Sequence, residues 1–327
     1  MALIPEFENI LLNVTGAKSA KKVQSIQSLW SGYGEIARMK LEGASQSSII
    51  IKNILLPTQA NHPRGWNTDR GHQRKLKSYE VEMVWYENYV DKCDESCRVP
   101  KCYVSKSKGN QHMIVLEDLD NAGFPGRHSS LSTDQIYACL TWLANFHAVF
   151  LGTKPDHLWQ IGTYWHLETR PDELAKMDHP KLKKAAFIID RTLNECLFKT
   201  LVHGDPKVAN FCFSTTDSSV AAVDFQYVGG GCGMKDVAYF IGSVLDEEEC
   251  ETRESELLQV YFTALKSATQ KHHPSLNVES LEEEWRKLFS IAWTDFHRFL
   301  LGWSPGHWKI NTYSERLAEK VINELGI

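Results

Sequence analysis

The sequence predicts an α+β fold with two lobes, in which a small antiparallel β-sheet with one main helix precedes a larger helical lobe. The first hundred residues contain short segments in which apolar and polar residues alternate, the pattern of half-buried strands. Beyond Asn121 the apolar residues recur at helical spacing instead. The change follows the apolar segment Met113–Leu116, so we place the lobes at 1–118 and 119–327, with a hinge between Leu116 and Asn121.

The N-terminal lobe is expected to form a sheet and one main helix. Ala37, Met39 and Leu41 alternate with basic residues, and Ser48–Lys52 is rich in β-branched residues, so both segments predict strands. In chain order we expect a helix at 7–14, strands at 23–30, 37–41 and 48–52, a polar loop at 57–75, a helix at 79–86, and extended segments from 99 and at 113–116.

The C-terminal lobe is expected to be mostly helical. Ser132, with Gln135 three residues later, has the pattern of a capping box and precedes an amphipathic stripe. Further helices are predicted at 236–245, 252–266, 281–303 and 314–325.

Composition limits the classes of partner. The 327 residues carry a net charge of −5 without a sustained basic stripe, so we expect no nucleic acid partner. No segment approaches the ~20 apolar residues of a membrane span, so we expect no membrane partner either. Eight scattered cysteines and the lack of a secretion signal predict reduced thiols and a cytoplasmic protein.

The most informative segment is Leu201–Gln226. The apolar residues Leu201 and Val202 precede a predicted loop, and two apolar runs follow at Phe211–Phe213 and Val220–Val223. The turn-prone stretch Ser214–Ser219 lies between these runs, so the pair predicts a β-hairpin.

Polar side chains flank this hairpin. Asn210 and Asp224 are equally distant from Asp217, so in-register pairing would place them opposite each other, about 5 Å apart. An amide oxygen and a carboxylate at this point, with Asp205 nearby, make an all-oxygen site suited to Mg²⁺. A free carboxylate beside such a site is what phosphoryl transfer from ATP requires. Single residues of these types usually only form turns, so the inference depends on their combination.

The spacing of H-G-D at 203–205, Asn210 and D-F-Q at 224–226 resembles that of small-molecule kinases in the protein-kinase-like superfamily. Aminoglycoside phosphotransferases, choline kinases and, from the D-F-Q ending, the ecdysteroid-kinase-like branch are the similar groups. Gly204 stands where protein kinases carry arginine, and Gln226 replaces the glycine of their D-F-G. The resemblance therefore implies a two-lobed protein-kinase-like fold and an ATP- and Mg²⁺-dependent kinase for a small-molecule hydroxyl, rather than a protein kinase.

The resemblance also implies catalytic roles. Asp205 would be the general base that orients the acceptor hydroxyl in line with the γ-phosphate. Lys207 would contact the γ-phosphate and neutralise developing charge, with a solvated loop lysine as the alternative. Asn210 and Asp224 would hold Mg²⁺, and Asp236 would brace the catalytic loop from the next helix.

Two elements of the first lobe are candidates for phosphate binding. Gly32 and Gly34 lie between predicted strands, where backbone amides can approach an anion closely, although a plain hairpin turn is the alternative. Lys52 ends a strand, and the resemblance implies that it pairs with Glu82 and holds the α- and β-phosphates, with Glu80 as the alternative partner.

The segment Met113–Leu119 resembles the L-V-L-E-D-L hinge of the same kinases. Backbone groups from Glu117 to Leu119 would then bind the adenine edge. A simple buried strand is the alternative.

The acceptor is expected to be a small hydroxyl compound: an amino alcohol, a sugar, an aminoglycoside or a steroid-like alcohol. A stripe on one helical face could be core or could hold a quaternary ammonium by cation–π attraction, as in choline kinases; its members are Trp285, Phe289, Trp293, Phe296, Leu300 and Trp303. Asp295, His297 and Trp165 lie off this stripe and are candidates to face a pocket.

Two rival functions stay open at this point. One is a catalytically silent nucleotide-binding protein that acts through a partner, against which the intact trio Asp205, Asn210 and Asp224 argues. The other is a structural metal site built from Asn210 and Asp224 without ATP. The choice between ATP and GTP and the oligomeric state are also open.

Overall fold

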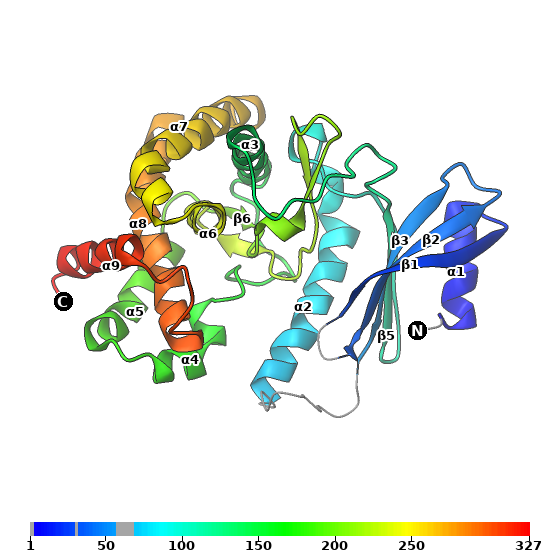
Figure 1. Cartoon of the computed structure of the whole chain (residues 1–327), viewed down its shortest axis with the longest axis horizontal. Coiled ribbons are helices and arrows are strands. Elements are labelled where there is room, and N and C mark those ends of the chain that lie inside the picture. The colour runs from blue at the N-terminus through cyan, green and yellow to red at the C-terminus, as the bar shows by residue number, and fades with distance from the viewer. Residues whose placement is uncertain (1–2, 30–31, 57–68) are drawn as a thin grey trace.

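A computed structural model describes residues 3–29, 32–56 and 69–327 and shows a sheet lobe followed by a helical lobe (Figure 1). The sheet lobe contains five antiparallel strands in the order β1-β2-β3-β5-β4. Its elements are α1 (Pro5–Thr15), β1 (Ser19–Ser28), β2 (Gly34–Glu42), β3 (Ser48–Leu55), α2 (Asp69–Asn88), β4 (Cys102–Lys108) and β5 (Gln111–Glu117).

The sheet lies between α1 and α2 (Figure 1). Side chains alternate between the two faces of a strand. Ile49 and Ile51 accordingly pack in the cluster that contains Phe7 of α1, whereas Ile50 and Ile114 pack in the large core that contains α2. The predicted alternation in this lobe therefore has a physical basis in two separate apolar layers.

The helical lobe contains two short antiparallel strand pairs among its helices. Its helices are α3 (Thr133–Val149), α4 (Pro171–Lys176), α5 (Pro180–Asn194), α6 (Met234–Val244), α7 (Glu247–His272), α8 (Val278–Trp303) and α9 (Thr312–Glu324). Its strands are β6 (Thr200–Val202), β7 (Phe211–Phe213), β8 (Val220–Ala222) and β9 (Gly229–Gly231). The capping box predicted for α3 is confirmed, because Ser132 and Gln135 bond each other's backbone amides through their side chains.

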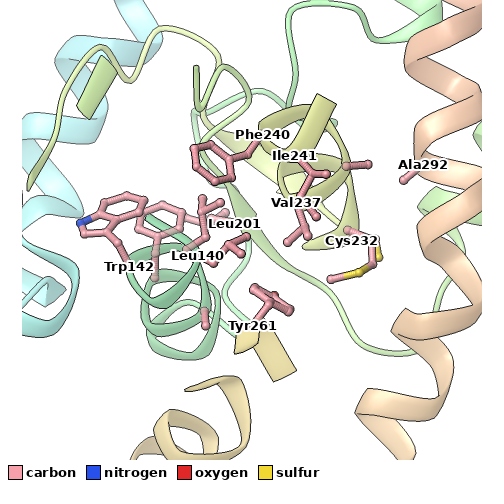
Figure 2. Close-up of a cluster of buried hydrophobic side chains, with 14 of the residues drawn as sticks. Leu140, Trp142, Leu201, Cys232, Val237, Phe240, Ile241, Tyr261 and Ala292 are labelled. Carbon is pink, nitrogen blue, oxygen red and sulfur yellow. The ribbon is translucent and has the colours of Figure 1, made fainter. Parts of the chain in front are cut away.

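The core of this lobe supports the strand that leads into the candidate catalytic loop. Leu201 of β6 lies among apolar side chains of several helices (Figure 2). These side chains include Leu140 and Trp142 of α3, Val237, Phe240 and Ile241 of α6, Tyr261 of α7 and Ala292 of α8. Because the loop is anchored in this close-packed region, its polar residues are held in defined positions.

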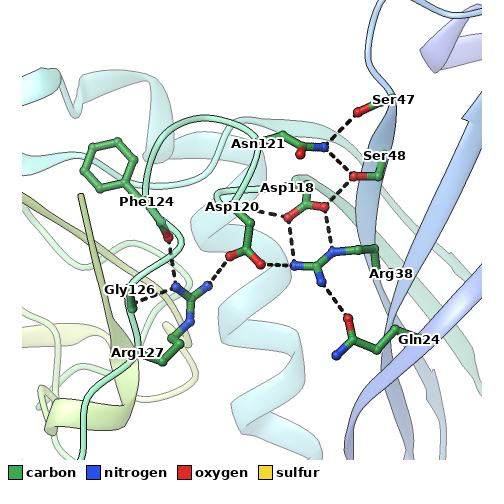
Figure 3. Close-up of polar contacts among 10 residues, drawn as sticks. All are labelled: Gln24, Arg38, Ser47, Ser48, Asp118, Asp120, Asn121, Phe124, Gly126 and Arg127. Carbon is green, nitrogen blue, oxygen red and sulfur yellow. Dashed lines mark hydrogen bonds and ion pairs between the residues drawn. The ribbon is translucent and has the colours of Figure 1, made fainter. Parts of the chain in front are cut away.

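A polar network joins the sheet to the segment after β5 (Figure 3). Arg38 of β2 donates to both carboxylate oxygens of Asp118, at 2.7 and 3.1 Å, and also bonds Asp120. Asp120 in turn accepts from Arg127 at 2.9 Å, and Asn121 donates to Ser48 at 2.6 Å. The predicted lobe boundary at 118/119 lies inside this network and stays a prediction.

Several element boundaries differ from the predictions; the helix predicted at 252–266, for example, is α7, Glu247–His272. The first strand is β1, Ser19–Ser28, rather than 23–30, and the extended segment from 99 becomes a strand only at Cys102. The predicted loop 57–75 is wrong for its last part, because α2 already begins at Asp69, while 57–68 lie outside the described residues. The first part of α2 lacks the apolar pattern from which a helix is predicted. Its residues Arg74 and Lys75 bond polar groups of the other lobe instead of packing in an apolar core.

The predicted hairpin forms, but with a different register. Phe211 pairs with Ala222 and Phe213 with Val220, and the Val223 amide donates to the Asn210 carbonyl at 2.9 Å. Asn210 therefore lies opposite Val223 rather than opposite Asp224. The turn takes one residue fewer than symmetric pairing about Asp217 would require.

Among residues 3–29, 32–56 and 69–327, none of the helices combines the length and apolar character needed to cross a membrane. All eight cysteines have free thiols.

Candidate active site

The candidate catalytic loop begins at His203, directly after β6, and Asp236 of α6 binds the backbone at its start. The backbone amides of His203 and Gly204 donate to the two carboxylate oxygens of Asp236, at 2.6 and 2.9 Å. His147 of α3 lies 3.2 Å from the same carboxylate, which is fully buried. Hydrogen bonds to a buried carboxylate are strong, so this aspartate fixes the backbone just before Asp205.

Gly204 is required by the close approach of another backbone segment. Its φ of 82° lies in the left-handed region, and an added Cβ would lie 2.2 Å from the carbonyl oxygen of Tyr227. The Gly204 carbonyl also accepts from the Tyr164 amide at 3.3 Å. The arginine that protein kinases carry at this position would therefore collide with the segment after Asp224.

Asp205 is held by contacts to both of its carboxylate oxygens. Tyr239 donates its hydroxyl to Oδ1 at 2.9 Å, and Lys207 Nζ donates to Oδ2 at 2.7 Å. Asn210 Nδ2 donates to the Asp205 carbonyl at 2.8 Å. Burial raises the pKa of Asp205, and Lys207 opposes this rise. The result is an oriented, basic carboxylate that is 6% exposed.

Asp224 lies just beyond β8 in a left-handed backbone conformation, with φ 69°, which is uncommon for a residue other than glycine. Its side chain is 35% exposed, and its Oδ1 is 3.5 Å from Lys52 Nζ. Burial alone would raise the pKa of Asp224. The ammonium groups of Lys52, Lys207 and Lys75 outweigh this effect and lower that pKa below the usual value.

The ion pair expected in the sheet lobe is present. Lys52 Nζ of β3 lies 2.6 Å from Glu82 Oε2 of α2, and both side chains are buried. Burial opposes the charge on Lys52, but Glu82 and Asp224 outweigh this and raise its pKa. The alternative partner Glu80 is 62% exposed and lies 3.8 Å from Lys77 instead.

Lys75 is a third cation of this region that the sequence interpretation missed. Its Nζ donates to Gln226 Oε1 at 2.7 Å and lies 4.6 Å from the ring centroid of Tyr79. Burial lowers the pKa of Lys75 to about 8. Extending the helical period of Tyr79 and Glu82 by one turn toward the N-terminus would have found it, because residues four apart share a helix face.

Phe225 connects the hairpin to both lobes. Its ring stacks on Trp85 of α2 with centroids 4.4 Å apart, and its centroid lies 4.6 Å from that of His203. The D-F-Q segment is thereby packed between the helix that carries Glu82 and the catalytic loop.

The two glycines of the first hairpin differ in their surroundings. Gly34 has φ 135°, and an added Cβ would lie 1.9 Å from the Asn53 carbonyl oxygen, so only glycine fits there. Gly32 closes a turn by donating its amide to the Leu29 carbonyl at 3.2 Å. Residues 30 and 31, between Leu29 and Gly32, lie outside the described residues. A role in phosphate binding stays a prediction for both.

The hinge residues already have internal partners. The Glu117 amide donates to the Lys101 carbonyl at 2.8 Å, and the Glu117 carboxylate pairs with Arg98 at 2.6 Å. The Leu119 carbonyl accepts from the Phe124 amide at 2.8 Å. An adenine contact at Glu117 would therefore need a group other than its amide.

The donors expected for a metal are an amide and a carboxylate. Asn210 Nδ2 faces Asp205, which leaves the other atom of its amide, Oδ1, for a cation. Within the described part of the chain, no group of three or more His, Cys, Asp or Glu side chains could hold a metal ion. A site built from Asn210 and Asp224 would thus need further oxygen ligands, such as those of phosphates.

The aromatic stripe of α8 is mostly core. Trp285, Phe289 and Trp293 belong to the large apolar core, and Phe296 and Leu300 pack in a second cluster. Only the last member, Trp303, is substantially exposed among the six, at 37%.

The residues expected to face a pocket beside this stripe point inward instead. Asp295 is buried in an ion pair with Arg298 at 2.8 Å and accepts from Trp165 Nε1 at 3.1 Å. His297 is buried as well, and burial lowers its pKa to about 4. This expectation is therefore wrong, because the ion pair and the indole satisfy the carboxylate inside the lobe.

The model of the ecdysteroid kinase-like family matches residues 35–161 and 162–273, which is most of the chain. No protein of curated function matches the sequence. Two solved structures are similar at 12% identity. The amicoumacin kinase hAmiN, in complex with AMP-PNP, Ca²⁺ and Ami, gives a TM-score of 0.56 and covers 97% of this chain and 92% of its own. A choline kinase from Cryptosporidium parvum Iowa II gives 0.54 and covers 94% and 90%.

At these identities the two structures bear on the fold, and they confirm the predicted two-lobed kinase-like architecture. The family match also confirms the branch that the D-F-Q ending indicated. The chain belongs to the ecdysteroid kinase-like family and is a phosphotransferase.

Proposed function

We propose that this protein transfers the γ-phosphate of ATP, with Mg²⁺, to a hydroxyl group of a small metabolite. One observation carries the proposal. Asp205 is an oriented, buried carboxylate, and Asp224 on the adjoining hairpin lies within the influence of three lysines. A fixed base beside a concentration of positive charge is the arrangement that phosphoryl transfer requires. Amino alcohols, sugars, aminoglycosides and steroid-like alcohols are the acceptor classes to test.

The charges at the site suit a metal-bound nucleotide. Lys52, Lys75 and Lys207 offer ammonium groups to phosphates, and Asn210 with Asp224 offers the oxygen ligands that Mg²⁺ prefers. Bound there, Mg²⁺ would supply electrostatic stabilisation of the transferring group. The AMP-PNP and Ca²⁺ of the amicoumacin kinase complex support a nucleotide and a divalent cation in this fold.

The chain's own residues would act on the acceptor as follows. Asp205 accepts a hydrogen bond from the acceptor hydroxyl and receives its proton as the new O–P bond forms and the bond to ADP breaks. Tyr239 keeps Asp205 oriented during this step. Lys207, already beside Asp205, keeps a positive charge where negative charge increases on the phosphoryl oxygens.

The rest of the site follows from the same arrangement. Residues 1–118 would form the nucleotide-binding lobe, with Gly32 and Gly34 over the phosphates and Glu117 to Leu119 along the adenine. Residues 119–327 would form the catalytic and acceptor-binding lobe. The eight free thiols support a reducing compartment, and we place the protein in the cytoplasm.

A coupled ADP-release assay with Mg²⁺-ATP and a panel of these acceptors tests the proposal. We expect turnover on at least one acceptor, and a loss of roughly 10²- to 10⁴-fold in Asp205→Ala. The variant should still be stabilised by Mg²⁺-ATP in a melting experiment. Nucleotide binding without any turnover would favour a silent nucleotide-binding protein, and no nucleotide binding at all would refute the phosphotransfer proposal.

A further inference from the structure

A group of aromatic side chains that we call the aromatic shelf extends from Asp205 toward the surface. Its members are Tyr164, Tyr239, Phe296, Phe299, Trp303 and Trp308. The shelf begins at the candidate base, because Tyr239 is the residue that donates to Asp205. It ends at solvent, because Trp303 and Trp308 are 37% and 58% exposed. An acceptor whose hydroxyl meets Asp205 would therefore approach the shelf beside Tyr239.

The chain places a cation of its own on this shelf. Lys309 lies in the segment between α8 and α9, and its Nζ is 4.7 Å from the ring centroid of Tyr239. The same atom is 5.4 Å from the centroid of Phe296 and 5.5 Å from that of Trp308. These distances are those of cation–π contacts. Lys309 thus occupies the position in which an aromatic cage would hold a ligand's ammonium group.

Lys309 is fixed in this position. Its Nζ donates to Ser243 Oγ at 2.6 Å, and the Ser243 hydroxyl donates to the Tyr239 carbonyl at 2.7 Å. Burial lowers the pKa of Lys309 to about 8, while the nearby carboxylate of Asp205 opposes this. At neutral pH the side chain is therefore still mostly charged.

The acidic groups near the shelf are already neutralised. Asp295 beneath it is paired with Arg298, and Glu173 beside it accepts from Arg170 at 3.1 Å. The Arg170 guanidinium itself lies 5.2 Å from the ring centroid of Phe299. The shelf therefore carries cations at two points. Of its neighbouring carboxylates, Asp205 pairs with Lys207, and Asp295 and Glu173 pair with arginines.

We infer that Lys309 is a specificity-determining residue, which makes the acceptor site select hydroxyl compounds that lack an ammonium group and that offer Lys309 an oxygen acceptor. The inference rests on the proposed function, since it concerns the acceptor of that same site. A second ammonium on the shelf would be repelled by Lys309 and would have to displace it from its aromatic contacts. A neutral or anionic oxygen would instead accept a hydrogen bond from it.

Binding of tetramethylammonium chloride to the intact protein tests the occupied cage without any need for turnover. Lys309→Met keeps about the length of the side chain and removes its charge. A ligand cation then meets no repulsion and has only a flexible, neutral side chain to displace from the rings. By titration calorimetry we expect the variant to bind tetramethylammonium at least about tenfold more tightly than the wild type. Equal affinity in the two proteins would overturn the inference.

Two further variants keep this test interpretable. Ser243→Ala removes the hydroxyl that anchors Lys309, along with its bond to the Tyr239 carbonyl, but leaves the ammonium group in place. It should therefore change the affinity in the same direction but by less. Lys287→Met is the matched control, because Lys287 is an exposed lysine of α8 that pairs with Glu283, and it should bind tetramethylammonium as weakly as the wild type. An affinity gain in Lys287→Met equal to that in Lys309→Met would contradict the assignment.

Turnover supplies a separate test with a matched pair of alcohols: choline, and the dimethylbutanol in which carbon replaces the choline nitrogen. We expect the ratio of kcat/KM for the neutral alcohol to that for choline to exceed one in the wild type and to fall at least about tenfold in Lys309→Met. A preference of the wild type for choline would refute the inference and leave the proposed function intact. If neither these alcohols nor any other acceptor were phosphorylated, the proposed function would fail, while the tetramethylammonium result would still decide the position of Lys309.

Discussion

The two sides of Asp205 differ in the chemistry of their side chains. The side toward Asp224 is ionic: Lys52, Glu82 and Lys75 converge there, and each has a charged or polar partner. The side toward the aromatic shelf is assembled from rings, with Tyr239 as the only side chain that bonds the candidate base from that direction in the described structure. Under the proposed function the ionic side would meet the same phosphates in every reaction, whereas the aromatic side would have to suit one acceptor.

This contrast has a consequence for variants. A change on the ionic side should affect turnover equally for every acceptor, because the nucleotide is common to all of them. A change on the aromatic shelf should alter the ranking of acceptors. If variants on the two sides had the same effect on the ranking of acceptors, the proposed difference between the sides would be wrong.

The largest expected effect on the ionic side is that of Asp224→Asn. Loss of this carboxylate removes an oxygen ligand of the proposed metal and a charge that balances Lys52. We expect kcat to fall roughly 10²- to 10³-fold for each acceptor tested, measured by ADP release. We also expect Mg²⁺ to lose most of its contribution to stabilisation by ATP in a melting experiment.

Asp217→Asn is the control for this variant. Asp217 lies in the turn of the same hairpin, also has a left-handed φ, of 55°, and bonds His128 at 3.1 Å. Asparagine tolerates this conformation, so kcat should stay within about twofold of the wild type. A comparable loss in both variants would show that the hairpin fold, rather than the Asp224 charge, had been disturbed.

The ionic side could be predicted largely from the sequence because its groups occur at fixed separations along short segments. The two apolar runs around Ser214–Ser219 located the hairpin. The resemblance to small-molecule kinases implied Glu82 as the partner of Lys52, and this is confirmed. The register of the hairpin could not be predicted, since symmetric pairing about Asp217 assumed a longer turn than the chain uses. Lys75 was missed because polar residues of α2 resembled a loop.

The aromatic shelf could not be predicted, for a physical reason. Its members come from three separate segments, around Tyr164, at Tyr239 and from Phe296 to Trp308, and they meet only through the packing of α6 and α8. An apolar stripe at helical spacing cannot show which ring faces the core and which faces a ligand. Asp295, for instance, is a charged residue beside the apolar stripe, as a pocket residue could be, but it is buried against Arg298.

The next effect in size concerns Glu82→Gln. Glutamine keeps the shape but leaves the buried Lys52 with Asp224, 3.5 Å away, as its remaining carboxylate partner among those described. We expect the free energy of unfolding to fall by roughly 1–3 kcal/mol in urea, because a charged hydrogen bond in the core is weakened. The KM for ATP should rise by a common factor whichever acceptor is used.

Glu80→Gln is its matched control on the same helix. Glu80 is exposed and contacts Lys77 weakly, so the variant should change stability by less than about 0.5 kcal/mol. If Glu80→Gln were the more damaging of the two, the assignment of the partner of Lys52 would be wrong.

The smallest effect tests the contact between the aromatic shelf and Asp205, the residue at which the two sides meet. Tyr239 belongs to the aromatic shelf and donates to Asp205, whose pKa is raised by burial. The hydrogen bond stabilises the ionised carboxylate, so Tyr239→Phe should raise that pKa further. The acid limb of kcat/KM would then move to higher pH by up to about one unit, since one such bond is worth about 1 kcal/mol.

The pH profile distinguishes this role from simple packing. Phenylalanine keeps the ring of Tyr239 on the shelf, so at a pH well above the limb the ranking of acceptors should be preserved while the limb itself moves. Tyr137→Phe is the control, because Tyr137 also donates to a carboxylate, that of Glu256, but on the exposed face between α3 and α7. A limb that stays in place in Tyr239→Phe would mean that Asp205 is not the group whose ionisation governs turnover. The ionic and aromatic sides would then not meet at this carboxylate.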